Sequence, residues 1–150
     1  MASSQDIALH IIRAFQEAGD PITNLKLQKL LYYVQGWYLG LHGEPAFNEE
    51  LEAWVHGPVE PGVYRAFREH RWSPIIVDRE SWPELHAKLR EHVALVLGAY
   101  GEDPAYALER RTHLEDPWLR ARGGIPRDQE STAVISKASM QKFFAAEAND

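Results

Sequence analysis

The chain has 150 residues, of which 45% are hydrophobic and 25% charged, a composition typical of an ordinary soluble globular protein. A chain of this length buries roughly 68–70% of its unfolded surface, which is enough for a hydrophobic core that needs no covalent cross-links. The absence of cysteine excludes disulfides and thiolate zinc sites. The net charge of −6 disfavours a DNA or RNA partner, because non-specific nucleic-acid binding depends on cation–phosphate contacts.

The first predicted element is a helix over residues 4–18, in which Ile7, Ile11 and Phe15 recur at helical spacing until Gly19-Asp20-Pro21 ends it. The N-terminal residues carry no basic stretch followed by an apolar run, so we expect no secretory signal. No apolar run approaches 18 residues, so we expect no membrane span. Together with the lack of cysteine, these features predict a cytoplasmic protein.

A long central helix is predicted from Thr23 to Gly43, and we expect the rest of the fold to be organised around it. Thr23 can cap its N-terminus with the hydroxyl, and Gly43 can end it in the left-handed conformation. One apolar stripe at helical spacing contains Leu27, Leu30, Leu31, Val34, Trp37, Tyr38 and Leu41.

The flanks of this helix are also largely apolar, with Tyr32 on one side of the stripe and Tyr33, Gly36 and Gly40 on the other. A helix that is apolar nearly all round is buried, or keeps one face for a partner. We expect a buried central helix whose Tyr32 and Tyr33 edges are left for a partner. Gly36 and Gly40 would let another backbone approach closely.

A period of two over residues 51–56 predicts a short strand that Gly57-Pro58 breaks, since Leu51, Ala53 and Val55 alternate with Glu52, Trp54 and His56. Pro61-Gly62 starts a predicted helix, and the β-prone triplet 75–77 is too short to assign. A helix is then predicted from Ser81, as the cap, to Tyr100.

Asp103 is the expected cap of a shorter helix over residues 104–113, and Asp116-Pro117-Trp118 begins another helical turn. Residues 121–131 form the predicted flexible loop, and Ser136 caps a last helix over residues 137–148. The prediction is a mainly α fold of five to seven helices around a central buried helix, with room for a short β-hairpin, forming one domain over residues 1–150.

The seven histidines suggest no metal site, since neither HxxxH nor HExxH occurs. His56 lies where the strand meets the Gly-Pro turn, so its ring either bonds a backbone group or is presented with Gly57 and Val59 to a partner. His113 lies at the end of a predicted helix, where the helix dipole favours a cationic imidazole, so a structural capping role is the main alternative to a functional one. With Glu60 or Glu115, the two histidines could form an acid–base site.

No GxSxG motif, Gly-rich phosphate loop or cysteine nucleophile accompanies these histidines, so we expect no enzyme and no cofactor. A basic cluster is either a solvated surface that offsets the acidic residues or a surface for an anionic partner; its members are Arg110, Arg111, Arg120, Arg122 and Arg127.

Three segments, TNLKLQKLLYYVQGWYL, EAWVHGPVEPGVYRAF and LERRTHLEDPW, resemble the Panacea, or SocA-like, antitoxin domain, which has also been called the phage-associated GepA-like family. Their order and spacing follow the family pattern, and the resemblance runs from about residue 5 to residue 147. The family often has tyrosine at the position of His56, which weakens the case for His56 as a catalytic group.

The resemblance implies a prokaryotic binding protein that neutralises a toxin, encoded by the adjacent gene, through direct protein–protein contact. Because the family domain fills the chain, we expect no independent nucleic-acid binding. The motif positions carried over are Leu27, Gln28, Lys29, Leu30, Tyr32, Tyr33, Gly57, Pro58, Val59, Tyr64, Thr112, His113, Pro117 and Trp118.

Leu27 and Leu30 are expected in the core, whereas aromatic and hairpin positions are expected to contact the partner, because aromatic anchors dominate interface energetics. The predicted partner-binding residues are Tyr32, Tyr33, His56, Gly57, Pro58, Val59, Tyr64, His113 and Trp118. Two other functions stay open: an adaptor that delivers a toxin to an energy-dependent protease, and a small hydrolase that uses His56 and His113.

Overall fold

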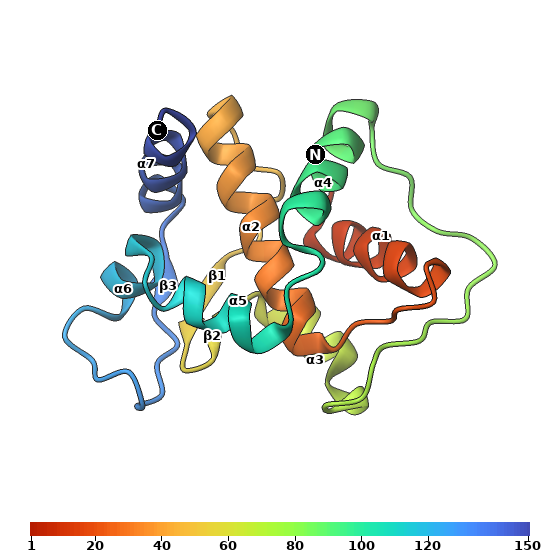
Figure 1. Ribbon diagram of the computed structural model, residues 1–150, viewed down its shortest axis with the longest axis horizontal. Coiled ribbons are helices and arrows are strands. Elements are labelled where there is room, and N and C mark those ends of the chain that lie inside the picture. Colours follow the sequence, from red (N-terminus) through yellow and green to blue (C-terminus); the bar gives the residue numbers. More distant parts are fainter.

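Six α-helices and a small sheet are arranged around the central helix α2 in the computed structural model, which describes residues 1–150 (Figure 1). This architecture confirms the predicted mainly α fold with a short β-hairpin. The helices are α1 (Ser4–Glu17), α2 (Asn24–His42), α3 (Pro61–Phe67), α4 (Ala87–Tyr100), α5 (Ala105–Thr112), α6 (Asp116–Arg122) and α7 (Lys137–Ala148), with a 3-10 turn at Arg68–His70. The strands are β1 (Leu51–Trp54), β2 (Gly57–Val59) and β3 (Val134–Ile135).

Helix α2 begins and ends where its local signals predict. The Thr23 hydroxyl accepts a hydrogen bond from the Lys26 N–H, and Gly43 adopts a left-handed φ of 71° at the C-terminus. Both flanks of the helix are buried together with most of its central stripe, except for the half-buried Trp37 and for Leu41, which is 51% exposed. Helices α1, α3, α4, α5 and α7 contact α2, so its nearly uniform hydrophobicity reflects burial on most sides.

Helix α7 packs directly on the glycine side of α2, and the two helices lie side by side (Figure 1). The Phe144 ring lies over Gly36, so any side chain at that position would overlap it. A Cβ at Gly40 would lie 2.7 Å from the Phe144 carbonyl carbon. The two glycines therefore provide the close approach that their spacing predicts.

The sheet is antiparallel, with the strand order β2-β1-β3. The prediction that Gly57-Pro58 breaks the strand is wrong, because both residues belong to β2 and Pro58 pairs with Ala53. The reversal instead occurs just before Gly57, whose φ of 116° is accessible to glycine but strained for other residues. Proline is tolerated in β2 because β2 is an edge strand.

Two predicted helix starts are wrong. Helix α4 begins at Ala87 and is capped by the His86 ring, which accepts the Leu89 N–H, so Ser81 is not its cap. Pro104, and not Asp103, occupies the N-cap of α5, without a side-chain hydrogen bond. Helices α1, α6 and α7 lie where predicted, and Ser136 caps α7 as expected.

The residues before α4 form a long extended strap along the edge of the molecule (Figure 1). The Gln16 side chain makes two hydrogen bonds of 2.9 Å with the backbone of Val77, and the Ile75 N–H donates to the Ile22 carbonyl at 2.7 Å. These contacts with α1 and the α1–α2 connection hold the strap extended. None of the helices combines the length and hydropathy that crossing a membrane requires.

Candidate partner-binding site

The N-terminal part of α2 is joined to the β2–α3 junction by a chain of buried amides. Gln28 accepts the Glu60 N–H at 2.8 Å and donates to the Asn24 side chain at 3.0 Å. Asn24 in turn donates to the Tyr64 carbonyl at 3.1 Å. The amide chain therefore fixes the position of Tyr64 relative to α2.

Lys29 lies beneath the hairpin, buried between β2 and α5. A Cβ at Gly57 would lie 3.0 Å from Lys29 Cε and 3.1 Å from Thr112 Oγ1, so only glycine fits closely here. The Lys29 ammonium has no hydrogen-bond partner. Burial lowers the pKa of Lys29 to about 7, and the Glu109 carboxylate opposes that shift.

Tyr32 and Tyr33 converge on one half-buried carboxyl group, that of Glu115. Their hydroxyls donate to Glu115 Oε1 at 3.0 and 3.2 Å, and the Tyr33 ring stacks on Tyr100 with centroids 3.9 Å apart. Burial raises the pKa of Glu115 to about 7, against the opposing effect of the tyrosine hydrogen bonds. Both tyrosines are 0% exposed, so the expectation that their edges are free for a partner is wrong.

Trp118, near the turn between α5 and α6, connects this part of the chain to strand β1. Its indole N–H donates to the Trp54 carbonyl at 2.8 Å, the His113 ring stacks on it at 4.2 Å, and the Arg122 guanidinium lies 4.7 Å from its centroid. Trp118 is 1% exposed, so its side chain is part of the core.

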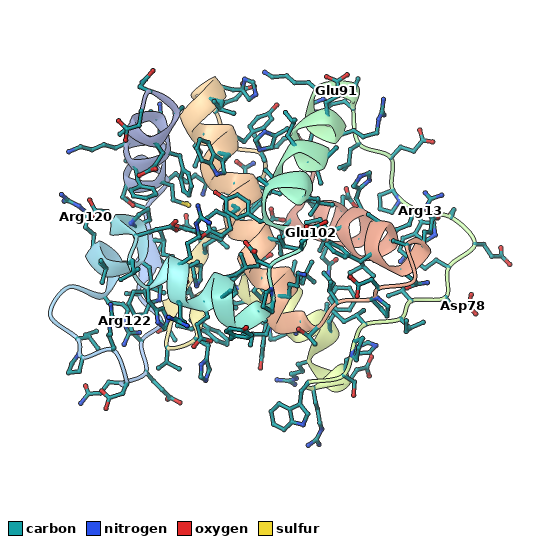
Figure 2. All side chains as sticks on the ribbon, in the orientation of Figure 1. Arg13, Asp78, Glu91, Glu102, Arg120 and Arg122 are labelled. Atoms are coloured by element: carbon teal, nitrogen blue, oxygen red, sulfur yellow. The ribbon has the colours of Figure 1, made fainter.

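Arg122 is also buried, and it donates to the Ala53 carbonyl at 2.9 Å (Figure 2). Arg120, in contrast, is exposed on the outer side of α6 (Figure 2). The predicted basic cluster is therefore divided between a structural arginine and exposed ones.

A surface groove of about 530 Å³ opens beside the hairpin. It lies between the N-terminal end of α2, the hairpin, α3 and the start of α5, and is lined by Leu25, Trp54, His56, Tyr64, Trp72 and Glu109 among others. Three predicted partner-binding residues, His56, Val59 and Tyr64, meet here. Gly57 and Pro58 are buried behind the groove, and His113 is half-buried outside it.

Aromatic side chains form the walls of this groove. Trp54 and Tyr64 pack edge to face with centroids 5.0 Å apart, and Trp72 is 87% exposed. Arg71, just before Trp72, has a φ of 55°, a conformation that costs a non-glycine residue about 1–3 kcal/mol and is concentrated at functional sites. Sequence reasoning missed Arg71 and Trp72, because neither backbone strain nor exposure has a local sequence signal.

The two carboxylates that the hydrolase hypothesis names are engaged elsewhere in the structure. His56 is exposed and its Nδ1 lies 3.3 Å from Glu109, not from Glu60 or Glu115. Glu60 caps α3, Glu115 binds the two tyrosines, and His113 stacks on Trp118. Neither Glu60 nor Glu115 is hydrogen-bonded to His56 or His113, as the hypothesis required.

These observations define a mainly α domain in which buried polar residues from three separate segments hold an aromatic groove at the surface. A family model described as "Antitoxin SocA-like, Panacea domain" matches residues 27–119, and the chain belongs to that family. The matched range includes every motif position that the resemblance carried over.

The chain is also similar to "Antitoxin SocA" of Caulobacter vibrioides (strain NA1000 / CB15N), with 55% identity over 47 residues. The alignment covers 31% of this chain and 25% of that relative, so it spans only about a quarter of the relative's length. No solved structure matches the chain.

Proposed function

We propose that this protein is a cytoplasmic antitoxin that neutralises a cognate protein toxin by direct binding, and that the aromatic groove is the centre of the binding surface. The family supports the antitoxin role. The groove supports direct binding, because Trp72 exposes 87% of its surface beside two further aromatic side chains. Tryptophan and tyrosine are enriched among the residues that carry most of the energy of an interface.

The buried motif residues support this function indirectly. Gln28 fixes the β2–α3 junction to α2, and Lys29 lies under Gly57, so these positions set the shape of the groove without touching a partner. A preformed binding surface loses less conformational entropy when it binds. We therefore assign His56 and Tyr64 to partner contact, and the buried Val59, Tyr32, Tyr33 and Trp118 to positioning the elements around the groove.

The proposed antitoxin domain spans residues 1–150. Helices α1 and α7 lie wholly outside the matched range 27–119, yet both pack on α2. The toxin is expected to be the product of the adjacent gene, and masking of its active or substrate-binding surface is favoured over delivery to a protease.

Co-expression with the adjacent gene in a heterologous host tests this function. We expect the neighbour alone to arrest growth, and this protein to restore growth while the two co-purify as a stable complex. An equal half-life of the toxin with and without this protein supports masking, whereas faster loss of the toxin supports the adaptor function. Absence of both toxicity and a complex would contradict the proposal.

A further inference from the structure

An acidic hollow lies next to the aromatic groove, and we propose that one extended segment of the partner binds in both. An apolar side chain of this segment enters the aromatic groove, and a lysine or arginine two or three positions away enters the acidic hollow. This inference rests on the proposed function and specifies the chemistry of the partner.

The acidic hollow has a volume of about 490 Å³, and its lining is polar or charged except for Pro61 and Gly62. It lies where the N-terminus of α1 meets β1 and the start of α3. Four carboxylates line it, from Glu49, Glu50, Glu52 and Glu60, against the single guanidinium of Arg65.

Existing contacts satisfy these carboxylates only in part. Glu49 accepts the Ser4 N–H at 3.1 Å, and Glu60 accepts the Ser4 hydroxyl and caps α3. Lys137 lies 3.6 Å from Glu50, whose side chain is 59% exposed. Arg65 forms no ion pair with any of the four, so the hollow retains negative charge that a partner's cation can reach.

Groove and hollow share one wall. Glu52 and Trp54 lie on the same face of β1, alternating with the buried Leu51 and Ala53, and the Trp54 indole N–H donates to Glu52 at 2.8 Å. On α3, Tyr64 lines the groove and the next residue, Arg65, lines the hollow.

Two residues along a strand are separated by about 7 Å. A partner segment that crosses the shared wall therefore needs a similar rise, which is two to three residues of extended chain. The carboxylates do not converge as metal ligands do, since no cluster of three or more such groups is close enough to hold an ion. A mobile, long cationic side chain fits the hollow better than a bound metal.

A random twelve-residue peptide library, displayed on phage and selected on the purified protein, tests this inference without the toxin. We expect enriched peptides to contain an aliphatic or aromatic residue and a lysine or arginine two or three positions apart. Enriched peptides without a basic residue, or no enrichment, would overturn the proposal.

Charge-neutral variants then locate the basic side chain. E50Q/E52Q removes two charges from the hollow, and the amide oxygen introduced at position 52 remains an acceptor for the Trp54 indole. The matched control E91Q/E102Q removes the same charge from exposed positions on and after α4 (Figure 2). For the best peptide at low salt, we expect E50Q/E52Q to weaken binding by about tenfold, mainly through slower association, and the control to bind within about twofold of wild type.

The same variants with the adjacent-gene toxin separate this inference from the proposed function. Neutralisation and complex formation that E50Q/E52Q leaves unchanged at low salt would contradict the acidic-hollow contact while the antitoxin function stands. Failure of the wild-type protein to bind or neutralise the toxin would contradict the proposed function itself.

Discussion

Substitution of Gly40 by alanine tests the packing on which the whole fold depends. In a free helix this change would stabilise by about 1 kcal/mol, because glycine is the poorer helix former. In this protein, however, the added Cβ would lie 2.7 Å from the Phe144 carbonyl carbon and 2.8 Å from the Ala145 amide nitrogen. These are backbone atoms, so α7 must move away from α2.

Movement of α7 loosens a well-packed part of the core, since Phe144 is 1% exposed. Overpacking of this kind costs about 1–3 kcal/mol, more than the helix propensity gained. After subtraction of the helix-propensity gain of about 1 kcal/mol, we expect Gly40→Ala to lower the free energy of unfolding by up to about 2 kcal/mol. Urea denaturation followed by circular dichroism measures it.

Gly98→Ala provides the matched control. Gly98 also lies inside a helix, α4, but an added Cβ there meets no atom within 4 Å. We expect this variant to be more stable than wild type by about 0.5–1 kcal/mol. If Gly40→Ala were as stabilising as Gly98→Ala, the close contact between α2 and α7 would be refuted.

Two further predictions concern pH and use urea denaturation between pH 5 and pH 9. Because burial lowers the pKa of Lys29 from 10.5 to about 7, the unfolded chain binds more protons above pH 7, and this residue makes stability rise with pH there by up to about 1.4 kcal/mol per unit. Lys29→Met should lose that rise and be more stable than wild type at pH 6; an unchanged slope above pH 7 would contradict the burial of an unpartnered amine. Because burial raises the pKa of Glu115 from 4.5 to about 7, the folded protein binds more protons between these values, and stability should fall as pH rises from 5 to 7. Glu115→Gln should reduce that fall; a variant with the full wild-type fall would argue against this assignment.

The sequence predicted elements whose signals are local. Thr23 and Gly43 mark the ends of α2 by their own side-chain and backbone chemistry, and both are confirmed. The Gly36 and Gly40 spacing predicted a close approach, although not that Phe144 of α7 provides it. Ser81 has the local features of a cap but caps nothing, because contacts of the strap with Gln16 and Ile22 hold the chain extended before α4.

The candidate site was less predictable, because its layout depends on long-range contacts. The burial of Tyr32 and Tyr33 depends on Glu115, more than 80 residues away in sequence. Nothing near the two tyrosines indicates that an acceptor is available inside the protein. Trp72 was missed for the opposite reason, since only the folded structure shows that a large aromatic side chain stays exposed at the rim of a groove.

The dissociation constant of the complex with the adjacent-gene product, measured for Trp72→Ala, tests the central claim most directly. The control is Leu95→Ala, which truncates an apolar side chain that is 72% exposed on α4, outside the groove. We expect Trp72→Ala to weaken binding about 30-fold or more, as for an interface residue that contributes at least about 2 kcal/mol, and Leu95→Ala to change it by less than about twofold. Wild-type affinity in the folded Trp72→Ala variant would contradict the assignment of the aromatic groove as the toxin-binding surface.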